Sequence, residues 1–118
     1  MPERSVIFDK QAFMERFGND EDIVREIIEI AIIDVPNQIV RLKECIQKGD
    51  MKLIAQQAHT LKGSSSNINA QALTILALEL ENAAKEGNAL AVPPLLSDLE
   101  LQLTLLMDSL KEAFDKKE

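Results

Sequence analysis

The chain contains a single histidine, His59, and residues of a chemically suggestive kind follow it. Neutral imidazole is a nucleophile near physiological pH, and a phosphoramidate on its ring nitrogen is labile enough to be passed onward. Lys62 lies three residues on, about one helical turn away, where its ammonium could offset the charge of a phosphoryl group. His59 is therefore a candidate for phosphoryl chemistry.

Gly63 comes next, in the middle of the same predicted helix, where glycine costs about 1 kcal/mol relative to alanine. An exposed helix position has no packing reason to require glycine, so something needs open space beside the imidazole. Ser64, Ser65 and Ser66 extend this run of small residues. We expect a low surface around His59 that a large partner can reach, with Gly63 and Ser66 on the binding face.

Three more residues are candidates for the surroundings of His59. Gln56, about one turn earlier, could hydrogen-bond near the site, and Ala55 is assigned with it to the binding surface. Glu81 could approach His59 from the next helix. The commoner arrangement for Glu79 and Glu81, however, is a solvated helix face.

The helices that must position these residues belong to one predicted domain, residues 1–118, with an ordered core from about residue 7 to 114. A chain of 118 residues, 46% of them apolar, is long enough for one core, and the absence of Trp and Tyr makes that core aliphatic. The apolar residues recur at helical spacing, which is typical of a soluble helical bundle. We expect Asp115 to Glu118 to fray.

Turn and capping signals divide the chain into helices. A short first helix carries Phe13 and Phe17 and ends at Gly18. These Phe side chains are either core or part of an apolar docking surface around the histidine, and the core is the commoner place for them.

A long second segment runs from Asp20 or Asp22 to Gly49, and its early apolar residues are predicted to share one face: Ile23, Ile27, Ile30 and Val35. Proline disfavours helical geometry in the residue before it, so Pro36 predicts a kink or short break at Val35. One bent helix and two separate helices both fit this pattern.

Asp50 caps the predicted helix Met51 to Asn67, and further helices are predicted over Ala70 to Glu86 and from Pro93-Pro94 to about Phe114. Four long helices joined by short turns predict an all-α fold, an antiparallel four-helix bundle with a short additional N-terminal helix.

Within Met51 to Asn67, successive residues lie about 100° apart around the helix axis, and four of them gather on a predicted buried face: Ile54, Ala58, Leu61 and Ser65. His59 lies about 140° from that face and Gly63 about 180°, so both are predicted to face solvent. A di-iron or haem bundle would need several inward-facing Glu and His ligands, which argues against a metal site.

The sequence has no Gly-rich nucleotide loop, no P-loop and no acidic cluster typical of a Mg²⁺ site. We therefore expect no cofactor, no ATP binding and no unaided transfer to an aspartate. The net charge of −7 would repel nucleic acid and anionic membrane, which favours a protein partner. With one cysteine, no signal-like start and no long apolar run, the chain is expected to be cytoplasmic. We also expect a monomer.

The stretch from Ala58 to Ala70, AHTLKGSSSNINA, closely resembles the signature of histidine-containing phosphotransfer (HPt) domains. In that signature Lys and Gly follow the histidine three and four places on. The resemblance extends over nearly the whole chain, through a Phe-containing first helix and three further pieces: DxP at Asp34 to Pro36, Gly49-Asp50, and Leu80-Glu81. Asn69 departs from the family, which usually has Gly there, but Asn tolerates a left-handed backbone well.

This resemblance implies that His59 is the phosphorylated residue, Lys62 its electrostatic neighbour and Gly63 the gap that admits the partner. The implied partners are a response-regulator receiver domain, which supplies the Mg²⁺ and the acceptor aspartate, and a sensor or hybrid histidine kinase. The chain would then be a phosphocarrier in a two-component phosphorelay, without autokinase activity, rather than an enzyme. The alternative is a helical adaptor that binds partners without phosphoryl chemistry, and acid-labile phosphate uptake distinguishes the two.

Overall fold

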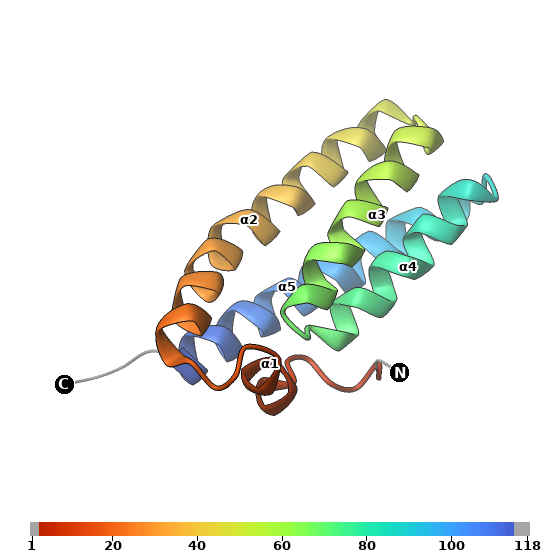
Figure 1. The fold of residues 1–118 in the computed structure, drawn as a ribbon. Helices are drawn as coiled ribbons and strands as arrows, with labels where there is room; N and C mark the ends of the chain where they lie inside the picture. Colours follow the sequence, from red (N-terminus) through yellow and green to blue (C-terminus); the bar gives the residue numbers. More distant parts are fainter. Residues whose placement is uncertain (1–2, 115–118) are drawn as a thin grey trace.

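A computed structural model describes residues 3–114, and the predicted fraying of Asp115 to Glu118 concerns residues outside that range. The described part contains five α-helices and one short 3-10 turn, in this order: α1 Lys10–Arg16, α2 Glu21–Lys48, α3 Met51–Asn67, α4 Gln71–Lys85, η1 Ala89–Ala91 and α5 Val92–Phe114. Helix α2 packs against α3 and α5, and α4 packs against the same two helices (Figure 1). The four long helices therefore close into a bundle, with α1 across one end, which confirms the predicted fold class.

The turns on either side of α3 follow from their residue types. Gly49 has a φ of 70° and ends α2, and the Asp50 side chain accepts a hydrogen bond from the Leu53 amide at 3.2 Å. At the other end, Asn69 has a φ of 57°, the left-handed conformation that its residue type was expected to tolerate. The Asn69 carbonyl also accepts a hydrogen bond from the Asp9 amide at 3.0 Å, which ties the N-terminal segment to this turn.

Pro36 does not break α2, which is one continuous helix of 28 residues, so of the two arrangements that the sequence left open the single helix is the one that forms. The reason lies in the packing on both sides of the proline. Buried residues occur before it and after it on one stripe of the helix: Val24, Ile28, Ala31, Val35, Gln38, Ile39 and Leu42. Burial of this stripe against α3 and α5 outweighs the local cost of a missing amide proton.

The face predicted for the first half of α2 is right for Val35, which is buried, and for Ile27, which packs against the core, but wrong for Ile23 and Ile30. Ile23 and Ile30 are exposed, at 45% and 67% of their surface, while Val24 and Ile28 are buried. The isoleucines at positions 23, 27 and 30 recur at helical spacing, which suggested that they form the inner face. The apolar residues that follow them in sequence, Val24, Ile28 and Ala31, are the ones that are buried. Apolar spacing alone did not identify which of two apolar stripes turns inward.

Phe13 belongs to the core, where it is fully buried, and Phe17 and Met14 pack against that core. The Phe13 ring lies 5.2 Å from Phe17 and 6.4 Å from Phe114, measured between ring centroids. Helix α1 therefore closes one end of the bundle.

The helical stretch Ala89–Phe114 is long and apolar enough to cross a membrane by length and composition alone. Core helices of soluble proteins meet the same criterion. In this structure three of its leucines are completely buried, or nearly so, within the bundle: Leu99, Leu106 and Leu110. We therefore treat α5 as a bundle helix.

Candidate functional site

Helix α3 presents His59 to solvent, as its pattern predicts. The four residues of the predicted inner face have exposed fractions of 1% or less: Ile54, Ala58, Leu61 and Ser65. The His59 side chain is 66% exposed. The imidazole is therefore open to a molecule the size of a protein.

Glu81 on α4 is the centre of the polar contacts around His59. One of its oxygens, Oε2, lies 3.1 Å from His59 Nδ1 and 3.0 Å from the Lys85 ammonium. The other, Oε1, accepts a hydrogen bond from Lys62 Nζ at 2.9 Å. One carboxylate on α4 thus joins two side chains of α3 and one of its own helix.

Glu81 is 4% exposed, and its charged partners decide its protonation state. Burial by itself raises the pKa of the Glu81 carboxyl, but hydrogen bonds from Lys62, Lys85 and His59 together outweigh burial. The net result lowers the pKa of Glu81 from an ordinary 4.5 to about 2. The carboxyl is therefore ionised at neutral pH and can only accept hydrogen bonds.

This charge state selects one form of the neutral imidazole. Because an ionised carboxylate has no proton to donate, the contact with Nδ1 requires the imidazole to carry its proton on that nitrogen. The lone pair of the neutral ring is then on Nε2. The arrangement can support nucleophilic chemistry at Nε2.

A shallow hollow of about 440 Å³ lies beside the imidazole, between α3 and α4, and its lining residues are Lys52, Ala55, Gln56, His59, Glu81 and Lys85. Ala55 and Gln56 thus lie where the sequence placed them, next to His59. Within residues 3–114 the Gln56 side chain makes no hydrogen bond to the imidazole. The Gln56 backbone carbonyl accepts a hydrogen bond from the Thr60 hydroxyl at 3.2 Å.

The surface on the other side of the histidine is low. A β-carbon built on Gly63 would meet no atom within 4 Å, apart from the helix's own backbone, so the glycine is not required by close packing. Ser66 is exposed one turn further on, and its carbonyl accepts a hydrogen bond from Arg16 at 3.3 Å. Gly63 and Ser66 both belong to the open face of α3.

Of the two arrangements expected for Glu81, the approach to His59 from the next helix is the one that forms. Glu79 has the more solvated position, with a side chain that is 36% exposed and paired with Arg4. Lys85 was not predicted as part of the site. Its spacing of four residues from Glu81 is the ordinary spacing of a helical ion pair and was the available signal. The sequence left open whether Glu81 points at α3 or at solvent, and the position of Lys85 depends on that choice.

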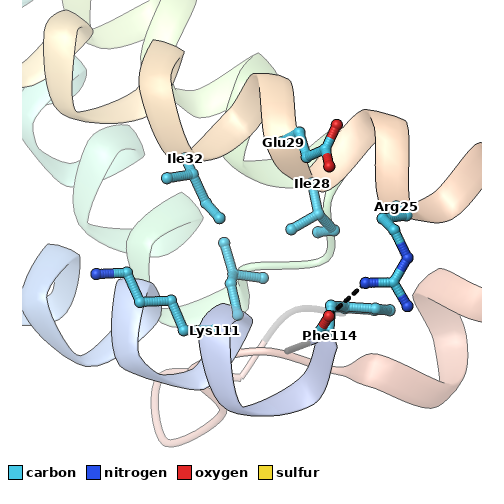
Figure 2. Close-up of a pocket in the computed structure, with 7 residues that line it drawn as sticks. Arg25, Ile28, Glu29, Ile32, Lys111 and Phe114 are labelled. Atoms are coloured by element: carbon cyan, nitrogen blue, oxygen red, sulfur yellow. Dashed lines mark hydrogen bonds between the residues drawn. The ribbon is translucent and has the colours of Figure 1, made fainter. Parts of the chain in front are cut away.

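A second hollow of about 330 Å³ lies between α2 and α5, and Figure 2 shows its walls. Ile28, Ile32 and Leu110 supply its apolar surface, and Arg25 donates a hydrogen bond to the Phe114 carbonyl at its edge. None of its lining residues belongs to the His59 site. This hollow lies where the C-terminal end of α5 packs against α2.

Comparison with known proteins agrees with the geometry. A family model described as the Hpt domain matches residues 26–113. The chain is 24% identical over 112 residues to the virulence sensor protein BvgS of Bordetella pertussis. That match covers 93% of this chain but only 9% of BvgS, so the chain corresponds to a small part of that protein.

Two solved structures share the fold. Histidine-containing phosphotransfer protein B (HptB) of Pseudomonas aeruginosa superposes with a TM-score of 0.89 at 23% identity, covering 97% of this chain and 99% of HptB. The HPT domain of an Hpt sensor hybrid histidine kinase from Shewanella gives a TM-score of 0.79 at 15% identity, covering 95% of this chain and 97% of that domain. Both similarities extend over whole chains.

Proposed function

Because the chain belongs to the Hpt domain family, whose members carry phosphoryl groups in two-component signalling, we propose that His59 exchanges a phosphoryl group with the aspartate of a response-regulator receiver domain. The observation that carries this proposal is the exposed imidazole whose Nδ1 contacts the ionised Glu81. That contact leaves Nε2 free as the nucleophile. A sensor or hybrid histidine kinase completes the proposed set of partners.

In the proposed transfer, Nε2 of His59 attacks the phosphorus of an aspartyl phosphate on the partner. The nitrogen–phosphorus bond forms as the phosphorus–oxygen bond breaks, and the aspartate leaves as a carboxylate. The substituted ring then carries a positive charge, and Glu81 lies 3.1 Å from its Nδ1 to balance it. The reverse transfer follows the same path.

Lys62 and Lys85 have a second part in this proposal. Both ammonium groups contact Glu81, which holds them next to the imidazole in the free protein. A phosphoryl group on His59 would bring new anionic oxygens beside them, and Lys62, with 28% of its side chain exposed, can turn toward these oxygens. Mg²⁺ and the catalytic acidic groups would come from the receiver, so this chain acts as a phosphocarrier without kinase activity of its own.

The test is transfer of labelled phosphate from phosphorylated receiver domains to the purified chain. We expect acid-labile label on the wild-type chain and none on His59→Gln, which keeps a polar side chain of similar length. Label that survives acid, or label retained by His59→Gln, would contradict the proposal. Binding of receivers without any labelled chain would favour the non-catalytic adaptor instead.

Glu81 supplies a second arm of the same test. Glu81→Gln keeps an acceptor oxygen for Nδ1 but removes the negative charge, whereas Glu81→Leu removes both. If the carboxylate sets the tautomer and balances the charged ring, we expect transfer to fall for Glu81→Gln and further for Glu81→Leu. Equal transfer rates in the wild type, Glu81→Gln and Glu81→Leu would show that Glu81 has no part in the transfer step.

A further inference from the structure

Helix α2 carries a second apolar stripe on the face turned away from the core. Its apolar members Ile23, Ile30, Ile33 and Val40 have exposed fractions of 45%, 67%, 67% and 53%. Glu26 and Asn37 are exposed between them, and we call these six residues the outer stripe. At about 100° per residue, its centre lies about 160° from that of the buried stripe. Figure 1 shows α2 at the outer edge of the bundle.

The outer stripe has the spacing of a coiled-coil seam. Its members follow one another by steps of three, four, three, four and three residues, from position 23 to position 40. Alternation of three and four is the repeat that keeps one seam facing a second helix over a length of about 25 Å. Nothing in the folded chain covers this seam within residues 3–114, since α3 and α5 pack on the inner side of α2.

We propose that a second copy of this chain covers the outer stripe, through antiparallel pairing of the two α2 helices about a twofold axis. The stripe is symmetric about its own middle in residue type. Antiparallel pairing therefore sets Ile23 of one copy against Val40 of the other, and Ile30 against Ile33. It also sets Glu26 against Asn37, whose amide can donate a hydrogen bond to the carboxylate.

The charges of α2 favour the antiparallel direction. Residues 21–34 contain five acidic residues and one basic residue, whereas residues 35–48 contain three basic residues and one acidic residue. An antiparallel pair places each acidic half against a basic half. A parallel pair would place acidic on acidic and Glu26 opposite its own copy, which is unfavourable.

The contact is small. Helix α2 has 28 residues and is about 42 Å long, and a face about 10 Å wide gives less than the roughly 800 Å² per partner of a standard interface. Two of the six residues of the outer stripe, Glu26 and Asn37, are polar. We therefore expect a weak, reversible dimer in place of the monomer expected from the sequence. His59 contacts α4 and not α2, so the pairing leaves the imidazole open.

Sedimentation equilibrium from micromolar to millimolar concentration tests the pairing. The average mass should rise from 13.2 kDa toward twice that value. Ile30→Glu should weaken association at least about tenfold, because it buries two carboxylates in the seam. Leu101→Glu is the matched control, since Leu101 is 58% exposed on α5, and it should leave association unchanged.

Asn37→Lys tests direction. In the antiparallel pair the introduced ammonium faces Glu26, so association should strengthen, whereas in a parallel pair it would face its own copy and weaken association. A mass that stays at 13.2 kDa overturns the proposal, as does equal weakening by Ile30→Glu and Leu101→Glu. So does a monomeric chain in which Ile30→Glu lowers transfer from a receiver, because the stripe would then bind that partner.

Discussion

At the scale of single residues, the protonation state of one buried carboxyl governs what the exposed histidine can do. Glu81 contacts His59, Lys62 and Lys85, and these contacts keep it ionised well below neutral pH. Since the ionised form only accepts hydrogen bonds, the orientation and tautomer of the neutral imidazole follow from it. Three residue-level predictions test this arrangement.

His59→Ala should remove phosphoryl acceptance and leave the fold intact. The side chain is 66% exposed and its loss opens no cavity, so the free energy of unfolding should change by no more than about 0.5 kcal/mol. Thermal unfolding followed by circular dichroism measures the stability, and transfer of label from a phosphorylated receiver measures phosphoryl acceptance. A variant that melts well below the wild type would mean that the imidazole supports the bundle.

Glu81→Gln should lower stability by an amount that depends on pH. The pKa of Glu81 is depressed to about 2 in the folded chain, so its ionised form stabilises the fold above the ordinary pKa of 4.5. This contribution fades as the pH falls from about 4.5 toward 2. Urea unfolding of the wild type and Glu81→Gln should therefore show a gap at pH 7 that closes between these values. A gap independent of pH would contradict the depressed pKa.

Lys62→Ala should slow phosphoryl transfer, or shorten the life of the phosphorylated chain, without abolishing acceptance. A partly exposed charge contributes on the order of 1 kcal/mol through such a contact. Because salt screens it, the difference from the wild type should shrink at high ionic strength. Lys111→Ala, an exposed lysine on α5, is a control for loss of one positive charge. Identical kinetics for Lys62→Ala and Lys111→Ala at low salt would exclude Lys62 from the transfer.

At the scale of elements, α3 must combine a helical backbone with an open surface. Gly63 is inside the helix, where glycine weakens it, and a β-carbon there would meet nothing within 4 Å. The structure thus gives no reason within the chain for the glycine. If the proposed function holds, the open surface at Gly63 serves the approach of a partner to His59.

Gly63→Ala should stabilise the chain by roughly 0.5 to 1 kcal/mol, and Gly63→Gln should fold at least as well as the wild type. Transfer from the receiver should nevertheless fall as the side chain grows, because it occupies the space the partner needs. Melting temperature and transfer rate, measured for both variants, separate these effects. Normal transfer by Gly63→Gln would mean that the partner does not approach over this turn.

At the scale of the whole molecule, the site depends on the shared core of the bundle. Leu61 is fully buried two residues beyond His59, and Leu80 is fully buried next to Glu81. The two helices therefore place their functional side chains by packing the residues beside them. The core packing of α3 against α4 therefore fixes the position of His59 relative to Glu81.

Leu61→Ala should lower the free energy of unfolding by about 2 to 5 kcal/mol, because it leaves a cavity in an aliphatic core. With one core, unfolding should remain a single transition. Urea titration followed by circular dichroism is suitable, since the chain has no Trp or Tyr for fluorescence. The exposed Leu101→Ala is the control, and an equal loss from both would contradict the packing described for α3.

Local sequence was enough to predict much of this protein. Periodicity and caps predicted the helices and the inner face of α3, and the types and spacing of His59, Lys62 and Gly63 identified the candidate site. Asn69 adopts the left-handed conformation expected of it. These features depend on residues within a few turns of one another, so the sequence contains their physical cause.

Only the tertiary structure decided which competing surfaces turn inward. Both apolar stripes of α2 satisfy helical periodicity, and contact with α3 and α5 selects the one containing Val24 and Ile28. The same packing keeps the helix continuous through Pro36. Glu81 is equally ambiguous in sequence, since a glutamate at that spacing suits a solvated face. It becomes part of the site because α4 packs beside α3, where two ammonium groups and the imidazole N–H offset the cost of burying its charge.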